Sequence, residues 1–156
     1  MPTLSRVRGG IDANAWGKAF ENMVVRSGIK HGITVIRIPD GCETRRGARG
    51  PRVVRVRSPF DFVLLKRTQA VVFDAKTTAE TTFKYSNLTE HQLGSLKRCS
   101  EQAKNAGYLV FFRNFDEVVF YNIDILSALR PGKSVKPGDG MILGRSSSIG
   151  LDSLFK

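Results

Sequence analysis

Two short apolar runs separated by four residues constrain the fold of this chain more than any other feature. The runs at 60–65 and 70–75 are nearly continuous in Val, Leu, Phe and Ala, and a polar stretch at 66–69 joins them. Strands covered on both faces read as continuous apolar runs, whereas strands with one solvated face alternate. The pattern therefore predicts a β-hairpin in the middle of a covered sheet.

The rest of the chain supplies elements that would cover this hairpin. Apolar residues recur at helical spacing over 13–28, with Asp12 as the predicted N-cap, and Thr89 and Gln92 form a capping-box pair ahead of a second helix. That helix is predicted at 90–106, a short third helix at 123–129, and further strands at 33–38, 53–57, 108–112 and 118–121. This order predicts an α/β fold, with a mixed central sheet flanked by helices.

A chain of 156 residues is long enough to form one core without disulfides. The regular patterns lie in 1–129, which is predicted to be the functional domain. Segment 130–156 is rich in Gly, Ser and Pro and is predicted to be a loosely held C-terminal tail, although apolar patches at 141–143 and 151–155 are able to dock on the body.

The balance of charge indicates a polyanionic partner. There are 25 Lys and Arg residues against 14 Asp and Glu, which gives a formal charge of +11. A field of this sign attracts nucleic acid or anionic lipid. No apolar run is long enough for a membrane span, and Cys42 and Cys99 are too few for a disulfide framework. We therefore expect a cytoplasmic protein that binds nucleic acid and no membrane.

The positive charge is concentrated beside the predicted hairpin. Segment 31–67 holds nine Lys and Arg against three Asp and Glu, so it contributes +6 alone. A Gly- and Arg-rich loop is predicted at 39–52, followed by the strand at 53–57. A solubilising or RNA-binding loop would have the same composition. The candidate DNA-binding arginines are Arg45, Arg46, Arg49, Arg52, Arg55 and Arg57.

Two carboxylates interrupt the apolar hairpin. If the hairpin pairs residues whose numbers sum to 135, Asp61 lies opposite Asp74, and Lys76 projects from the same face. Opposed like charges repel across a sheet, but Mg²⁺ takes one or two protein carboxylates together with water and phosphate oxygens. The turn lacks Asn-Gly chemistry, so a longer loop with a shifted register is the alternative.

These groups are the ones that phosphodiester hydrolysis requires. A divalent cation activates water and neutralises charge on the phosphate, and a lysine holds either of them. Asp-x-Lys is a weak motif alone, because acids and lysines at strand ends are commonly just solvated. The second acid at matching depth, in a strongly basic chain, makes the catalytic interpretation the more specific one.

A longer motif around these residues resembles a known family. The segment Phe73-Asp74-Ala75-Lys76-Thr77-Thr78, followed by Thr82-Phe83, Asn87-Leu88 and His91-Gln92, is similar to the RecU-type Holliday junction resolvases of the PD-(D/E)xK nuclease superfamily. The resemblance covers about 20–129 and implies a restriction-endonuclease-like αβββαβ core. It implies that Asp61, Asp74 and Lys76 form the catalytic centre.

The resemblance also assigns further residues. It implies that Glu21 of the first helix is a catalytic metal ligand, although a solvent-facing acid fits its helical position nearly as well. It implies a catalytic role for Gln92 at a helix N-terminus, where free N–H groups favour phosphate. Ala75 is expected as a further metal ligand and Thr77 as a DNA contact. This chain has Asp74 where the family commonly has glutamate.

The resemblance implies a metal-dependent endodeoxyribonuclease of recombination and repair that nicks four-way DNA junctions symmetrically. Mg²⁺ is the expected cofactor, with Mn²⁺ as a substitute and no small-molecule cofactor. Two symmetric nicks need two sites related by a two-fold axis, so a homodimer is expected, with the loop at 39–52 entering the junction centre. The alternatives are a related nuclease acting on duplex or branched DNA, and a non-catalytic basic nucleic-acid-binding module.

Overall fold

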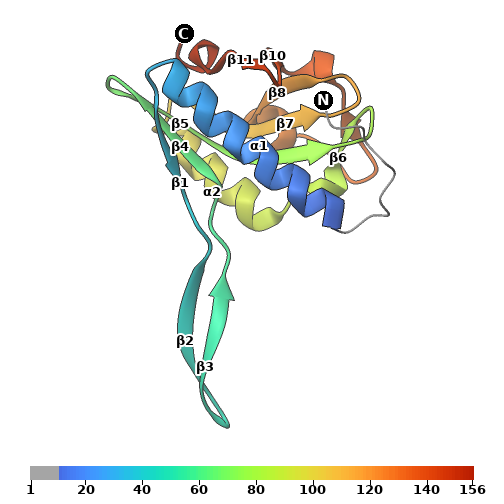
Figure 1. The fold of residues 1–156 in the computed structure, drawn as a ribbon. Helices are drawn as coiled ribbons and strands as arrows, with labels where there is room; N and C mark the ends of the chain where they lie inside the picture. The colour runs from blue at the N-terminus through green and yellow to red at the C-terminus, as the bar shows by residue number, and fades with distance from the viewer. Residues whose placement is uncertain (1–10) are drawn as a thin grey trace.

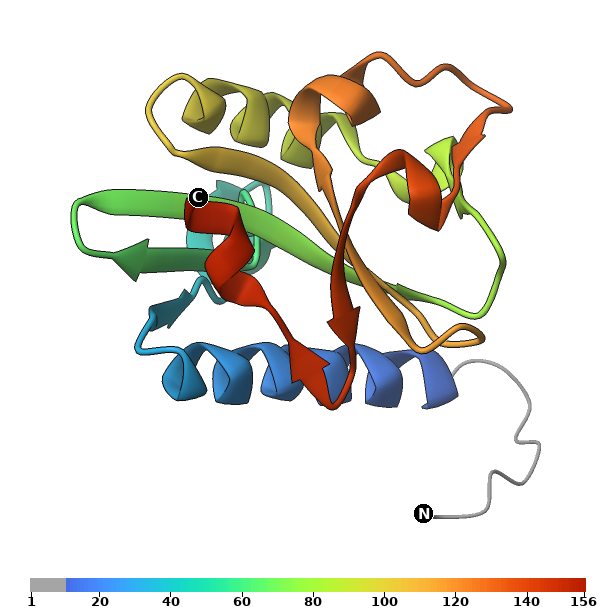
Figure 2. The ribbon, with the colours of Figure 1, turned by 90° about the horizontal axis from the view of Figure 1, so that it is seen from above.

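A mixed seven-stranded sheet organises the chain, and helices α1 (Ile11–Lys30) and α2 (Glu90–Ser100) lie on its opposite faces (Figure 1, Figure 2). The structure is a computed structural model that describes residues 11–156. The order of strands is β1 (Thr34–Arg37), β4 (Phe62–Lys66), β5 (Gln69–Thr78), β7 (Asn105–Phe112), β8 (Glu117–Asn122), β10 (Met141–Arg145) and β11 (Ser148–Ile149). The predicted α/β class with a mixed sheet between helices is confirmed.

Smaller elements complete the fold. Two-residue strands β6 (Phe83–Lys84) and β9 (Ser134–Val135) pair with each other. Beyond these, α3 (Ile123–Ser127) follows β8, and short 3₁₀ helices occur at η1 (Tyr85–Asn87), η2 (Pro137–Asp139) and η3 (Leu151–Phe155). The first helix begins at Ile11, so Asp12 lies within it and is not the N-cap that the sequence predicts.

The central hairpin has the predicted register. Strands β4 and β5 are antiparallel, with pairs running from Phe62 opposite Phe73 to Lys66 opposite Gln69. Two residues close the turn, and the first of them, Arg67, has φ 55°. This left-handed conformation lets a non-glycine turn close the hairpin without the longer loop that was the alternative.

Apolar side chains form one core on each face of the sheet. On one side, Phe20 and Val24 of α1 pack on Phe62 and Phe73 of the hairpin. On the other side, Leu96 of α2 lies in the cluster formed by residues of β7 and β8. Because β4 and β5 contribute to both clusters, the hairpin is covered on both faces, as its continuous apolar runs predict.

The second helix is shorter than predicted. It ends at Ser100, and β7 begins at Asn105, so Gly107 lies within a strand and does not end a helix. Residues from Asn105 onward pair in parallel with β5, where Val71 lies opposite Asn105, and so they form a strand. Tertiary pairing therefore overrides the local helical pattern of 101–106.

Gly107 allows strands β7 and β8 to approach each other. A Cβ atom at this position would lie 1.9 Å from the carbonyl oxygen of Tyr121. We expect Gly107→Ala to lower the free energy of unfolding by about 3 kcal/mol or more, because backbone of a central strand must move. Gly94→Ala is the control, since its Cβ meets only ordinary contacts inside α2 and should add about 0.5–1 kcal/mol. Urea unfolding measures both, and equal stability of the two variants would contradict the packing argument.

The C-terminal segment is not loosely held, contrary to the sequence prediction. Strand β10 pairs with β8 and extends the sheet, and β11 pairs with β10. Leu143, Ile149, Leu151 and Leu154 are buried in the core on the α1 side. The apolar patches recognised in the sequence dock because each buries side chains that the sheet edge would otherwise leave exposed.

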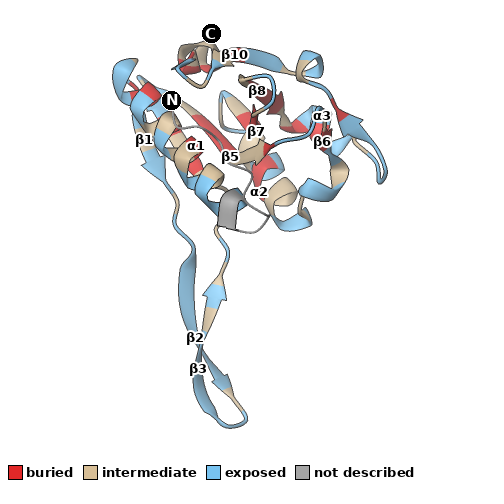
Figure 3. Ribbon diagram, turned by 45° about the vertical axis from the view of Figure 1, so that its right-hand side comes forward, coloured by how far each residue is buried: buried red, intermediate tan, exposed pale blue. Residues whose placement is uncertain are grey.

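The predicted loop at 39–52 is a two-stranded ribbon, and this corrects the sequence prediction. Strands β2 (Gly41–Gly47) and β3 (Gly50–Val56) pair antiparallel along their whole length. The ribbon projects from the body, and nearly all of it is exposed (Figure 1, Figure 3). Pairing satisfies the backbone hydrogen bonds of a segment that has no core to pack against. The strand predicted at 53–57 is the returning half of this ribbon.

Candidate active site

Asp61 and Asp74 meet at the open end of the central hairpin. The paired register ends at Phe62 opposite Phe73, and Asp61 and Asp74 are the next residues beyond this last pair. The backbone N–H of Asp61 donates to the carbonyl oxygen of Phe73 at 3.2 Å, and Oδ2 of Asp61 accepts from the N–H of Ala75 at 2.8 Å. The carboxylate of Asp61 therefore bends over β5 next to Asp74.

Asp74 is fully buried and only partly hydrogen-bonded. Its Oδ1 accepts from Nε2 of Gln92 at 2.9 Å. Its Oδ2 forms an ion pair with Nζ of Lys76 at 2.7 Å and has no other partner among the described residues. One ammonium group balances only part of the cost of burying this carboxylate next to a second one, and a bound cation would relieve the rest.

The surroundings of Asp74 disfavour its charge. Burial raises the pKa of its carboxyl to about 7, the ammonium of Lys76 opposes this shift, and the carboxylate of Asp61 adds to it. Two neighbouring carboxylates in a site of low dielectric resist full ionisation. A divalent cation between them would remove both the desolvation penalty and the repulsion.

Gln92 is oriented by its own helix cap. Oγ1 of Thr89 accepts from the N–H of Gln92 at 3.3 Å, and the same hydroxyl donates to Oε1 of Gln92 at 3.0 Å. The hydroxyl of Tyr108 lies 3.5 Å from that oxygen, at the β7 position that pairs with Asp74. Thr89 is the N-cap, as predicted, but the side chain of Gln92 does not complete the predicted capping box and directs its amide at Asp74 instead. Sequence analysis missed Tyr108, whose only signal is a hydroxyl within an apolar strand.

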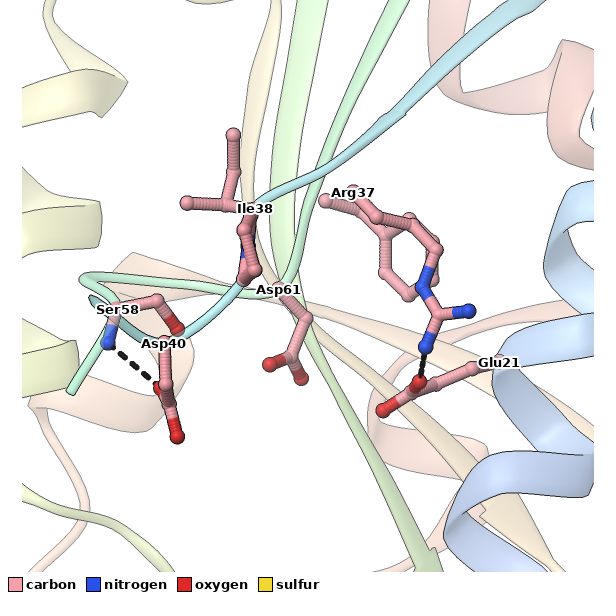
Figure 4. A pocket seen from close by; sticks show the side chains of 8 residues that line it. Glu21, Arg37, Ile38, Asp40, Ser58 and Asp61 are labelled. Atoms are coloured by element: carbon pink, nitrogen blue, oxygen red, sulfur yellow. Dashed lines mark hydrogen bonds and ion pairs between the residues drawn. The ribbon is translucent and has the colours of Figure 1, made fainter. Parts of the chain in front are cut away.

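Glu21 lies beside Asp61, in a pocket of about 270 Å³ (Figure 4). It approaches from α1 on one face of the sheet, whereas Gln92 approaches from α2 on the other. Its carboxylate pairs with Arg37 of β1, a neighbour that sequence analysis did not single out. Glu21 is therefore engaged in an ion pair and is not a plain solvent-facing acid. It forms no hydrogen bond or ion pair with Asp74 among the described residues, and its role as a metal ligand stays a prediction.

The donor set around Asp61 and Asp74 fits a hard divalent cation. Across residues 11–156 no three His, Cys, Asp or Glu side chains gather closely enough to hold a metal. Two carboxylates suffice for Mg²⁺, which keeps several waters. The N–H and C=O of one strand residue point to the same edge, so the carbonyl of Ala75 also opens toward Asp61. The residues present therefore suit Mg²⁺ and not a closed zinc site.

Three of the ribbon arginines lie next to the start of α2. Arg45, Arg55 and Arg57 line a groove of about 300 Å³ together with Thr89, His91 and Gln92 at the start of α2. Arg45 pairs with Glu43 at 3.2 Å, and Arg55 pairs with Asp40 at 2.5 Å. Arg46 and Arg49 lie exposed nearer the tip, and the exposed Arg52 lies opposite Arg45 across the ribbon. The groove connects the basic ribbon with the helix that carries Gln92.

Thr77 lies on the face of β5 opposite that of Asp74. Side chains alternate along a strand, so Thr77 of β5 projects to the side opposite that of Asp74 and Lys76. Its predicted DNA contact is therefore not made from the same face as the two acids.

Among residues 11–156, no helix combines the length and apolar character that crossing a bilayer requires.

Comparison with known proteins places the chain in a family. The family Recombination protein U (RecU) matches residues 31–135, well over half of the chain. The crystal structure of Hjc from Archaeoglobus fulgidus, a Holliday junction resolvase from an archaeal hyperthermophile, superposes with a TM-score of 0.56 at 18% identity, covering 81% of this chain and 95% of that one. A search of curated proteins found no match. The likeness to Hjc shows the fold, and the match over residues 31–135 shows that this chain belongs to the RecU family of Holliday junction resolvases.

Proposed function

We propose that this member of the resolvase family hydrolyses DNA strands at four-way junctions with Mg²⁺, at the site formed by Asp61, Asp74 and Lys76. The observation that carries the proposal is the fully buried carboxylate of Asp74, which lies beside the carboxylate of Asp61 and whose Oδ2 has only the ammonium of Lys76 as a partner among the described residues. Membership of a nuclease family supports a metal-dependent reaction, and the carboxylate donor set favours Mg²⁺, with Mn²⁺ as a substitute.

Each side chain of the site has a different role in the proposed reaction. Asp61, Asp74 and the carbonyl of Ala75 would hold the cation, and Glu21 would join them after leaving Arg37. When bound, Mg²⁺ lowers the pKa of water and offsets charge that grows on the phosphate. Lys76, about one-third exposed, presents its ammonium to the attacking water or to a phosphate oxygen. Gln92 holds Asp74 in place through Oδ1.

The ribbon would supply selectivity for junctions. A two-stranded ribbon is narrow enough to enter a DNA groove, and its exposed arginines match the converging phosphates at a junction centre. We propose that two copies of the chain bind one junction in the cytoplasm as a homodimer, so that each site nicks one of two opposed strands. Residues 11–129 would carry the site, and the segment from 130 onward would support it from the sheet edge.

A comparison of substrates and metals tests the proposed function. Purified protein is offered a four-way junction, a Y-fork and a linear duplex, each with Mg²⁺, with Ca²⁺ or with EDTA. We expect symmetric nicks in the junction with Mg²⁺ only. Equal cutting of linear duplex would instead show a nuclease without junction selectivity, and binding without any cutting would show a non-catalytic module.

Removing ribbon charge should weaken binding and flatten its salt dependence. Replacing Arg45, Arg46 and Arg49 with Ala removes up to three phosphate contacts, so the slope of log K against log salt should fall by about 0.9 for each lost contact. The control replaces Lys97, Lys104 and Lys133 with Ala, which removes equal charge from exposed positions off the ribbon. Fluorescence anisotropy over a salt series measures both slopes. Equal slopes in the two variants would mean that the ribbon does not bind DNA.

A further inference from the structure

A small cavity lies outside the candidate active site, between the C-terminal turns of α1 and the turn that joins β10 to β11. Its volume is about 210 Å³, and its lining contains three basic side chains, four serines and no acid. In Figure 1, β10 and β11 lie at the end of the body opposite the ribbon. The polar lining residues that matter are Arg26, Lys30, His31, Ser146, Ser147 and Ser148.

The two long basic side chains of the cavity lack acidic partners. Arg26 and Lys30 stand four residues apart on α1, so they are neighbours on one face of the helix. Among the described residues, neither forms an ion pair. Like charges at this spacing destabilise a helix by a few tenths of a kcal/mol, and an anion held between them would reverse that effect.

Asp152, an acid next to the cavity, pairs with Lys66 and orients His31. Asp152 accepts a hydrogen bond from Nζ of Lys66 at 2.5 Å, and its other oxygen lies 3.1 Å from Nδ1 of His31. Its ion pair with Lys66 and its contact with His31 help to hold the pKa of Asp152 low. Because Nδ1 faces Asp152, Nε2 is the ring nitrogen of His31 left for a ligand.

The two walls of the cavity are fixed to each other and to the sheet. The hydroxyl of Ser27 donates to the carbonyl oxygen of Ile149 at 2.6 Å, which ties α1 to β11. The N–H of Ser146 donates to Oδ1 of Asp116 at 3.1 Å, and Gly144, with φ 119°, permits the tight turn that carries the serines. A cavity with rigid walls requires little ordering when a ligand binds.

We propose that this cavity binds a phosphate group through Arg26, Lys30 and His31 and the hydroxyls of Ser146–Ser148. Guanidinium and hydroxyl groups are the natural donors to phosphate oxygens. The cavity is smaller than the roughly 300–1,000 Å³ of pockets that take drug-sized ligands, so it suits a single phosphate group. All its lining residues except His31 lie outside the segment 31–135 that matches the family. The phosphate comes either from a DNA arm that passes the body or from free phosphate.

A thermal-shift experiment without DNA or Mg²⁺ tests the site. Melting temperature is measured with inorganic phosphate and with chloride at equal ionic strength, because a bound ligand stabilises the native state. We expect phosphate to stabilise the natural chain more than it stabilises the double variant Arg26→Gln, Lys30→Gln. The control is Lys97→Gln with Lys104→Gln, where Lys97 occupies the last turn of α2 as Lys30 does in α1. The control should keep the full phosphate response.

Two results would overturn the proposal. Equal phosphate responses in the double variant and the control would show only the general effect of an excluded salt. A double variant that melts lower but keeps its phosphate response would show that these side chains only compensate the helix dipole.

The affinity for junctions, measured in EDTA over a salt series, distinguishes a DNA arm from free phosphate as the source of the bound phosphate. If a DNA arm supplies the phosphate, the slope of log K against log salt for long-armed junctions should be smaller in the double variant than in the control, by up to about two. For short-armed junctions the two slopes should then agree. If free phosphate supplies it, the slopes agree and only the thermal response is lost.

Discussion

Asp74→Asn is expected to lower the rate of junction cleavage in Mg²⁺ by on the order of a thousandfold, with junction affinity kept within a few fold. An amide of the same shape cannot supply the charge that holds the cation, so activation of water fails. Binding survives because the exposed arginines of the ribbon are unchanged. Single-turnover cleavage of a labelled four-way junction and anisotropy in Ca²⁺ measure the two quantities.

The matched control is Asp124→Asn, which neutralises an exposed aspartate in the first turn of α3, away from the hairpin. Its cleavage rate should stay within a few fold of the natural chain. Cleavage by the Asp74 variant at the rate of this control would exclude the proposed site.

The second large effect concerns stability without metal. Asp74 binds its proton more tightly in the folded chain, since its pKa is about 7 when folded and near 3.8 when unfolded. Between these values the native state holds more protons than the unfolded state, so the free energy of unfolding must fall as pH rises from about 4 to 7. Each pKa unit corresponds to about 1.4 kcal/mol, so the loss attributable to Asp74 amounts to a few kcal/mol.

Comparison with Asp74→Asn isolates this effect. The two proteins should have similar stability near pH 4, and the variant should be the more stable one at pH 8 in EDTA. Adding Mg²⁺ at pH 8 should stabilise the natural chain and leave the variant unchanged. Urea unfolding across pH measures these differences. A variant that is less stable than the natural chain at pH 8 would mean that Asp74 is ionised without penalty.

Together the two experiments separate chemistry from folding. A variant that is more stable at pH 8 and yet inactive cannot owe its inactivity to unfolding. The same carboxyl thus accounts for both effects, because the environment that makes its charge costly in the free protein is the one that creates affinity for a cation.

The ribbon and the C-terminal segment show where local pattern is a poor guide. Gly and Arg at 39–52 indicate a loop, yet cross-strand pairing between β2 and β3 satisfies the backbone and makes a ribbon. Gly, Ser and Pro after residue 130 indicate a loose end, yet Leu151 and Leu154 are fully buried. Each outcome depends on contacts with distant parts of the chain, which composition does not encode.

By itself, the sequence determined the central hairpin and its register, which bring Asp61 and Asp74 to the same open end, because strand pairing with a short turn is a local property. Only the tertiary structure decided that Gln92 and Tyr108 complete the surroundings of Asp74 and that Glu21 pairs with Arg37 beside Asp61. These contacts join elements brought together by packing on the two faces of the sheet, and burial there is also what shifts the pKa of Asp74.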